Sequence, residues 1–249
     1  MEVHHTHHPS HKKNWREYFL EFFMLFFAVT LGFFAENIRE NISNREKERI
    51  LIESVIQNLK TDTVTLGGCI QKNIQKNLFQ DSLLNLATSD LRTNENLYNF
   101  YNYFIKGTYL SLFIPSDAAM TQIKTNGGLS LISEKGVIDS ILNYDRQNKT
   151  IERHNSVYTE ESEYFWKTSY KLMETRILKD TNYVQFFHGR NMTGKMPPPI
   201  VNNKEELKIF FGTLTRVLLL TEVNRGYMIQ HKKDAENLIK FLKITYQLE

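Results

Sequence analysis

An apolar run near the N-terminus constrains this chain more than any other feature. From Tyr18 to Ala35 the sequence reads YFLEFFMLFFAVTLGFFA, and Glu21 is the one charged residue in it. As an α-helix this run is about 27 Å long, close to the roughly 30 Å thickness of the hydrocarbon core of a bilayer. The run contains no polar stripe that a surface helix of a soluble protein could turn towards water. It therefore predicts a transmembrane helix over residues 15–36.

The flanks of the run match the two interfaces of a bilayer. Trp15 and Tyr18 lie where aromatic side chains contact head groups, and charged residues follow at both ends. A signal peptide begins in a similar way, but its cleavage site needs small residues, and Phe33 and Phe34 occupy that position here. We therefore expect an uncleaved anchor. A buried helix of a soluble protein is the alternative, because the uncharged stretch Phe22–Ala35 is short enough to allow it.

One face of the predicted span combines small side chains with an acid. Steps of three and four residues place on a single stripe Glu21, Leu25, Ala28, Gly32 and Ala35. Small residues four apart let two helix backbones approach closely, and a glutamate in hydrocarbon is costly unless it faces protein, water or a cation. The stripe predicts a contact with a second copy or with a partner membrane subunit. Two other interpretations of Glu21 stay open: it extends to the head groups, or it lines an ion or proton path.

The distribution of proline predicts an all-α fold. The five prolines leave three stretches in which helices can run nearly throughout, at residues 10–114, 116–196 and 200–249. Apolar residues recur there every three or four positions, and strand signals are nearly absent. We expect one N-terminal transmembrane helix that continues into an antiparallel helical bundle. The expected divisions are a His-rich leader at 1–14, the transmembrane helix at 15–36, a helical stalk at 37–66 and a helical-bundle domain at 67–249, with a bend at Gly67-Gly68.

Caps and turn residues predict the individual helices of the bundle. The expected elements are an aromatic helix at 97–113, a short helix capped by Ser116 or Asp117 and ended by Gly127-Gly128, and one long C-terminal helix within the stretch 200–249, capped by Asn202 or Asn203 ahead of Glu205 and Glu206. Another long helix should follow Val137, but its inner face is only half apolar, because four polar residues interrupt it: Asn148, Asn155, Ser162 and Ser169. We expect water-filled gaps beneath that face or contact with a neighbouring chain.

Two segments resemble a known group of proteins. They read HHTHHPSHKKNWREYFLEFFMLFFAVTLGFFAENIREN and IPSDAAMTQIKTNGGLSLISEKGVIDSILNYD, and together they cover less than a third of the chain. Both are similar to blocks in an uncharacterised bacterial single-span membrane protein family with a His-rich N-terminal leader. The resemblance implies a single-pass protein of the bacterial inner (cytoplasmic) membrane. It implies no catalytic residue.

The orientation in the membrane has to be argued from charge. Lysine and arginine occur on both sides of the apolar run, so their count alone does not fix the orientation. The leader before the run is short and carries net positive charge, which is easier to retain in the cytoplasm. We therefore expect the N-terminus inside and the helical domain outside.

The leader is also the one candidate metal site that the sequence contains. Its five histidines are His4, His5, His7, His8 and His11. Neutral imidazoles bind zinc or nickel, and a flexible tail can wrap around an ion, although a His tract fixes no geometry. Alternatively, the tail lies at the membrane surface and becomes cationic as the pH falls. No other cofactor is expected, and the single cysteine, Cys69, excludes an internal disulfide.

Charge and motifs narrow the function further. The chain has 31 Lys+Arg against 28 Asp+Glu without a long basic stripe, so nucleic acid is not an expected partner. No phosphate-binding loop and no nucleophile with a nearby base can be identified, so we do not expect an enzyme. The sequence predicts a membrane-anchored helical protein that acts as an oligomeric scaffold or as an accessory subunit of a membrane complex. The alternatives are a subunit of an ion- or proton-conducting assembly that uses Glu21, and a metal-binding leader protein.

Overall fold

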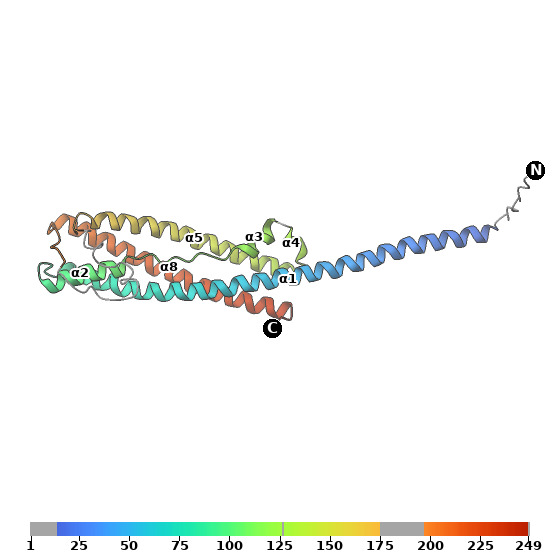
Figure 1. Cartoon of the computed structure of the whole chain (residues 1–249), viewed down its shortest axis with the longest axis horizontal. Coiled ribbons are helices and arrows are strands. Elements are labelled where there is room, and N and C mark those ends of the chain that lie inside the picture. Colours follow the sequence, from blue (N-terminus) through green and yellow to red (C-terminus); the bar gives the residue numbers. More distant parts are fainter. Residues whose placement is uncertain (1–13, 126, 175–196, 249) are drawn as a thin grey trace, which may run out of the picture. The chain divides into compact units, whose positions relative to one another are not determined.

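A computed structural model describes residues 14–125, 127–174 and 197–248. These residues form helices with connecting segments and contain no strand, so the all-α prediction is confirmed. In chain order the elements are α1 (Trp15–Asn85), the 3-10 turn η1 (Leu86–Thr88), α2 (Asn94–Gly107), α3 (Ala118–Thr125), α4 (Gly128–Leu131), α5 (Lys135–Ser169) and α8 (Lys204–Thr245) (Figure 1).

The chain divides into two compact units, Met1–Ile50 and Leu51–Glu249. This division falls earlier than the predicted boundary between a stalk and a bundle at residue 67. The reason is that the apolar core of the second unit already begins with Leu51, Ile52 and Val55. The expected bend at Gly67-Gly68 does not interrupt α1, which is helical through both residues.

In the described residues, the second unit is an antiparallel bundle of four segments that lie side by side. Contacts between α5 and α8 join Glu161 to Arg216 and Asn148 to His231, so these two helices run in opposite directions (Figure 1). The last part of α1 is the third segment. The fourth segment consists of α2, the extended residues 108–117 and α3, which together run back along α1. The predicted antiparallel bundle is therefore present, and one of its four segments is only partly helical.

Apolar clusters near both ends hold the bundle together. One gathers aromatic rings around Phe210, whose centroid lies 4.9 Å from that of Phe165 and 5.2 Å from that of Phe100. The other packs the start of the unit, from Leu51 onwards, against the C-terminal part of α8. Each completely buried large side chain contributes about 1.5–3 kcal/mol through its removal from water. The two clusters therefore supply most of the driving force for folding.

Two of the predicted helix-end residues are confirmed, Asn203 and Gly127. The side chain of Asn203 accepts hydrogen bonds from the first backbone N–H groups of α8, and Gly127 ends the α3 region with a left-handed φ of +68°. The predicted helix at 97–113 is too long, because α2 ends at Gly107. There the chain approaches α1 so closely that an added Cβ would lie 3.2 Å from Gln80 Cγ. Pro115 then disfavours a helical conformation for the residue before it.

Candidate functional site

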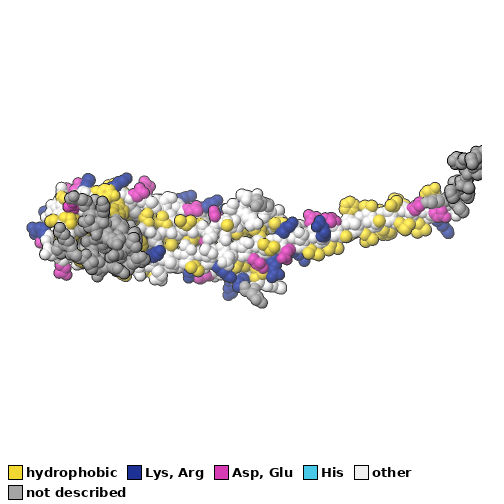
Figure 2. Space-filling view, in the orientation of Figure 1, with side chains coloured by type: hydrophobic (Ala, Val, Ile, Leu, Met, Phe, Trp, Pro, Cys, Tyr) yellow, Lys and Arg dark blue, Asp and Glu magenta, His cyan; other side chains and the backbone are white. Residues whose placement is uncertain are grey.

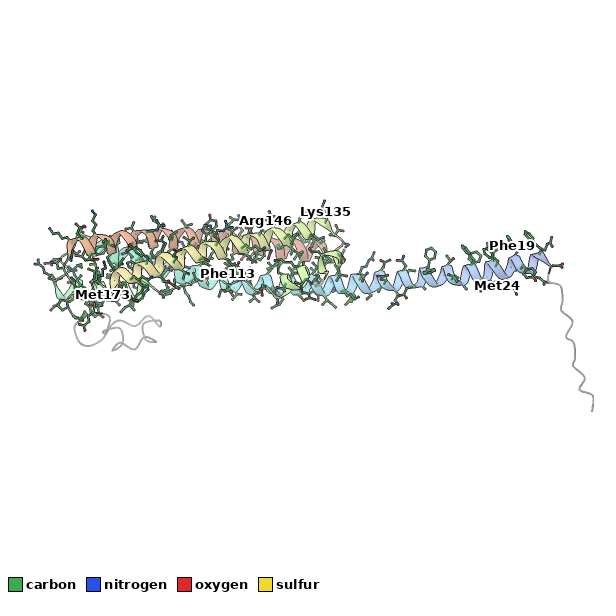
Figure 3. All side chains as sticks on the ribbon, turned by 90° about the horizontal axis from the view of Figure 1, so that it is seen from above. Phe19, Met24, Phe113, Lys135, Arg146 and Met173 are labelled. Atoms are coloured by element: carbon green, nitrogen blue, oxygen red, sulfur yellow. The ribbon has the colours of Figure 1, made fainter. Side chains whose placement is uncertain are left out.

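The N-terminal part of α1 exposes its apolar side chains. An 18-residue window reaches a mean hydropathy of 1.9, and none of it is buried inside the chain. Hydrophobic side chains cover the visible face of this segment (Figure 2), and the labelled Phe19 and Met24 point away from the helix (Figure 3). The helix is long and apolar enough to cross a membrane. A core helix of a soluble protein is mostly buried, whereas this window is not.

Aromatic rings form a ladder along one face of this segment. Ring centroids are 5.6 Å apart between Trp15 and Phe19, 4.7 Å between Phe19 and Phe23, and 5.8 Å between Phe23 and Phe27. At 100° per residue, the ladder lies on the side of the helix opposite Gly32. The segment therefore has one face of large rings and one face of small side chains.

The five predicted contact residues all lie on the second of these faces. All five of these residues are exposed, namely Glu21, Leu25, Ala28, Gly32 and Ala35. A Cβ added to Gly32 would meet nothing within 4 Å. The face is therefore sterically open to a second helix, and the contact itself stays a prediction.

The predicted metal ligands cannot be placed. All five leader histidines, His4, His5, His7, His8 and His11, lie outside the described residues. Within the described part of the chain, no group of three or more His, Cys, Asp or Glu side chains is arranged to hold a metal ion.

Buried polar side chains in the bundle donate hydrogen bonds to the backbone of the extended segment 108–117. An extended backbone inside a helical core has no ladder partner, so its N–H and C=O groups need partners from side chains. Helices α1 and α5 supply them through two amide donors, Asn73 Nδ2 to Ser111 O (3.1 Å) and Asn155 Nδ2 to Phe113 O (2.9 Å). A third amide, Gln80 Nε2, donates to the carbonyl of Gly107 at the end of α2 (2.9 Å). The amides of Asn73 and Asn155 act for the extended segment as a neighbouring strand would.

This arrangement explains the half-apolar face of α5. All four polar residues that interrupt it are buried within the bundle: Asn148, Asn155, Ser162 and Ser169. The side chains of Ser162 and Ser169 donate to carbonyls of their own helix, and Asn155 donates to the extended segment. A neighbouring chain is therefore not needed to cover this face.

A second polar group surrounds Asp62, which is 1% exposed. Its Oδ1 accepts from the backbone N–H of Ser116 at 2.8 Å, and its Oδ2 accepts from the hydroxyl of Tyr144 at 2.9 Å. Burial raises the pKa of the Asp62 carboxyl, although both hydrogen bonds act to lower it. Asp62 thus fixes the end of the extended segment to α1 and α5.

His231 packs beside this group. Its ring stacks on Tyr144 with centroids 4.3 Å apart, and its Nε2 lies 2.6 Å from Asn148 Oδ1 while its Nδ1 lies 3.2 Å from Gln147 Oε1. Burial lowers the pKa of His231 to about 4, so the imidazole is neutral at physiological pH. A neutral ring has one N–H, so it donates to one of the two amide oxygens.

We expect the neutral His231 to make the bundle sensitive to acid. The unfolded chain binds a proton on this residue near pH 6.5 and the folded chain near pH 4, so stability present above pH 6.5 is lost as the pH falls towards 4. The loss between about pH 7.5 and about pH 5 is about 2 kcal/mol. His231→Gln should remove that loss, which urea unfolding at the two pH values would measure. The raised pKa of Asp62 makes the folded chain more stable as the pH falls, and this contribution is the same in both proteins. If the variant lost as much stability between the two pH values as the original protein, this role of His231 would be contradicted.

Lys76 is a fully buried cation in the same core. Its ammonium donates to the hydroxyl of Tyr158 and lies 4.5 Å from the centroid of that ring and 5.8 Å from the centroid of Tyr109. Burial lowers the pKa of Lys76 and raises that of Tyr109 to about 12. The aromatic rings partly compensate the desolvation of the ammonium.

No protein-family model, curated protein or solved structure matches this chain. Its function is therefore argued from its own residues.

The sequence analysis singled out Asn148 and Asn155 but did not place Asp62, Lys76 or His231 in the core, although one signal for Asp62 was present. The apolar residues of α1 step through Leu59 and Leu66, and the position between them on the same stripe is Asp62. A polar residue at a core position of a helix needs a partner inside the core. The sequence alone does not show that the partner is the backbone of a distant extended segment.

Proposed function

We propose that this chain is a single-pass, membrane-anchored helical protein that acts as an oligomeric scaffold or as an accessory subunit of a membrane complex. The observation that carries this proposal is the apolar window of α1, none of which is buried in the chain. Leaving one large apolar side chain in water costs about 1.5–3 kcal/mol, and an uninterrupted surface of them needs lipid or another chain to cover it. The length of the apolar run matches a bilayer.

The two faces of the span support different contacts. The ladder from Trp15 to Phe27 presents bulky rings, which suit the irregular packing of lipid chains. The opposite face, with Ala28 and Gly32, allows the close backbone approach that membrane helices use to associate.

The resemblance to bacterial single-span proteins is the basis for assigning the chain to the inner membrane. The short, net positive leader favours a cytoplasmic N-terminus with the bundle on the outer side. In this topology the leader histidines face the cytoplasm and the second unit, Leu51–Glu249, lies in the periplasm.

We expect Gly32→Leu to weaken self-association at least tenfold, or about 1.4 kcal/mol, because the leucine separates the two backbones. Sedimentation equilibrium of the full chain in a non-ionic detergent measures the change. The matched control is Thr30→Leu, which adds the same side chain on the opposite side of the helix.

Equal association of the Gly32→Leu protein and the original protein would remove this face from the proposal.

Glu21→Leu tests the alternative of an ion path. If assembly survives that change while ion flux through the complex disappears, the conducting role is favoured over the scaffold. If assembly itself fails, Glu21 belongs to the contact.

A further inference from the structure

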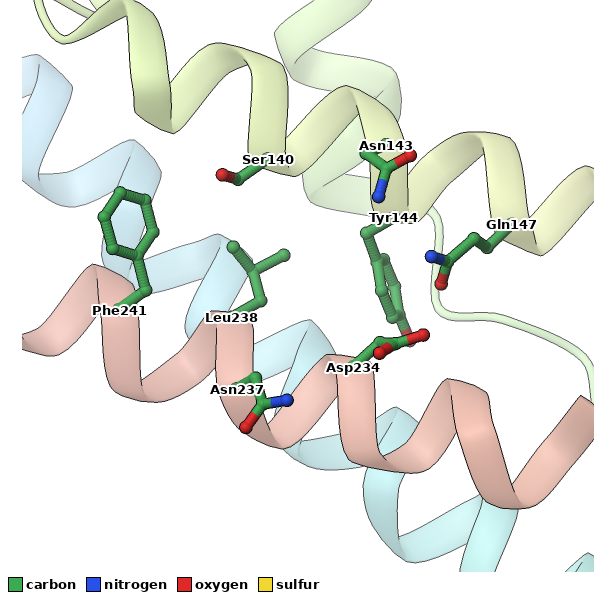
Figure 4. A pocket seen from close by; sticks show the side chains of 8 residues that line it. All are labelled: Ser140, Asn143, Tyr144, Gln147, Asp234, Asn237, Leu238 and Phe241. Atoms are coloured by element: carbon green, nitrogen blue, oxygen red, sulfur yellow. The ribbon is translucent and has the colours of Figure 1, made fainter.

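A cleft opens between α5 and α8 in the second unit, with a volume of about 250 Å³ (Figure 4). It lies away from the membrane helix in the sequence and plays no part in the proposed association. Both helices line it, through Ser140, Asn143, Tyr144, Gln147, Asp234, Asn237, Leu238 and Phe241. Its volume is below the range of about 300–1,000 Å³ typical of pockets for drug-sized ligands, so its occupant is small.

The lining of the cleft carries negative charge and no positive charge. Asp234 is the one lining residue with a charged side chain, and the lining contains no lysine or arginine. Its Oδ1 accepts from Gln230 Nε2 at 2.9 Å, which holds the carboxylate in place. The cleft therefore favours a positive group over a negative one.

The uncharged lining groups complete a site for an ammonium ion. Asn143, Gln147 and Asn237 each have an amide oxygen that can accept from an N–H group. Leu238 and Phe241 add apolar side chains at the other end of the lining (Figure 4). In Figure 4 the amide groups of Asn143 and Gln147 and the carboxylate of Asp234 lie on the same side of the cleft as the Tyr144 ring.

We propose that this cleft binds a small organic amine, whose ammonium group pairs with the carboxylate of Asp234 and donates to the surrounding amide oxygens. The apolar side chains of Leu238 and Phe241 contact the carbon chain of the ligand. This activity is independent of the proposed association in the membrane, since it uses residues of the second unit alone.

The test compares three four-carbon compounds that differ in their end groups. Isothermal titration of the full chain in a non-ionic detergent should show saturable binding of butane-1,4-diamine, at least tenfold weaker binding of butane-1,4-diol and no binding of butanedioate. Asp234→Asn should weaken diamine binding at least tenfold while retaining an acceptor for Gln230. Asp139→Asn is the matched control, because Asp139 is an exposed carboxylate of α5 outside the lining. Circular dichroism checks that both variants are folded.

Three results would overturn the proposal. One is the absence of diamine binding throughout the millimolar range. Another is equal binding of the diol, which would show that the ammonium group is not recognised. The third is equal diamine affinity of a folded Asp234→Asn protein, which would place the bound amine elsewhere on the surface.

Discussion

Phe210→Ala is expected to lower the free energy of unfolding of the bundle by about 3–5 kcal/mol. The ring of Phe210 is completely buried and contacts the rings of Phe100, Phe104 and Phe165, with centroid distances of 5.2, 6.1 and 4.9 Å. Truncation leaves a cavity that rigid neighbouring rings cannot fill. Urea unfolding followed by circular dichroism measures the loss.

Phe33→Ala is the matched control, because Phe33 is 73% exposed on the N-terminal segment of α1. It should change the unfolding free energy of the bundle by less than about 0.5 kcal/mol. If Phe33→Ala destabilised the bundle as much as Phe210→Ala, the two sets of phenylalanines would share one core. The division between a lipid-facing helix and a self-contained bundle would then be wrong.

Removing residues 1–40 is expected to give a protein that needs no detergent. The removed segment contains the whole apolar window, and the apolar clusters of the second unit begin only at Leu51. The truncated chain should elute from size exclusion as a single folded species, with the same urea midpoint as the full chain in detergent. The physical reason is that the longest apolar run is removed, while both apolar clusters of the second unit stay buried inside the bundle.

Aggregation of the truncated chain in the absence of detergent would contradict this expectation. A shorter truncation that removes only residues 1–14 is the control, because it deletes the leader and retains the apolar run. That protein should still require detergent. If both truncated proteins dissolved equally well, the apolar run would not be what makes detergent necessary.

Helix propensity and caps were enough to predict most of the architecture. The C-terminal helix and its Asn203 cap, and the left-handed Gly127, follow from local rules that act within a few residues. The apolar run was identified because its chemistry is independent of the rest of the fold. Such features can be predicted from sequence because their causes are local.

The extended segment 108–117 could not be predicted in the same way. Its conformation depends on donors such as Asn73 and Asn155, which are far away in sequence and appear only as interruptions of apolar stripes. The early start of the second unit, at Leu51, has a similar cause. Apolar residues of a stalk and of a bundle helix show the same periodicity, and only their partners distinguish them.

The cleft with Asp234 also escaped prediction. Its lining residues come from two helices that are about ninety positions apart in the chain, and no local motif connects them. On each helix the polar lining residues, such as Asn143 and Asn237, look like part of an ordinary solvated face. Their common role becomes visible only when α5 and α8 are packed in opposite directions.

The most direct test of membrane anchoring is the partition of the full chain after cell lysis. Membranes that contain it should be washed with alkaline carbonate, which releases peripheral proteins, and then sedimented. We predict that the chain stays in the pellet and is released only by detergent. Recovery of the intact chain in the carbonate supernatant as a dissolved monomer would contradict the proposed anchor.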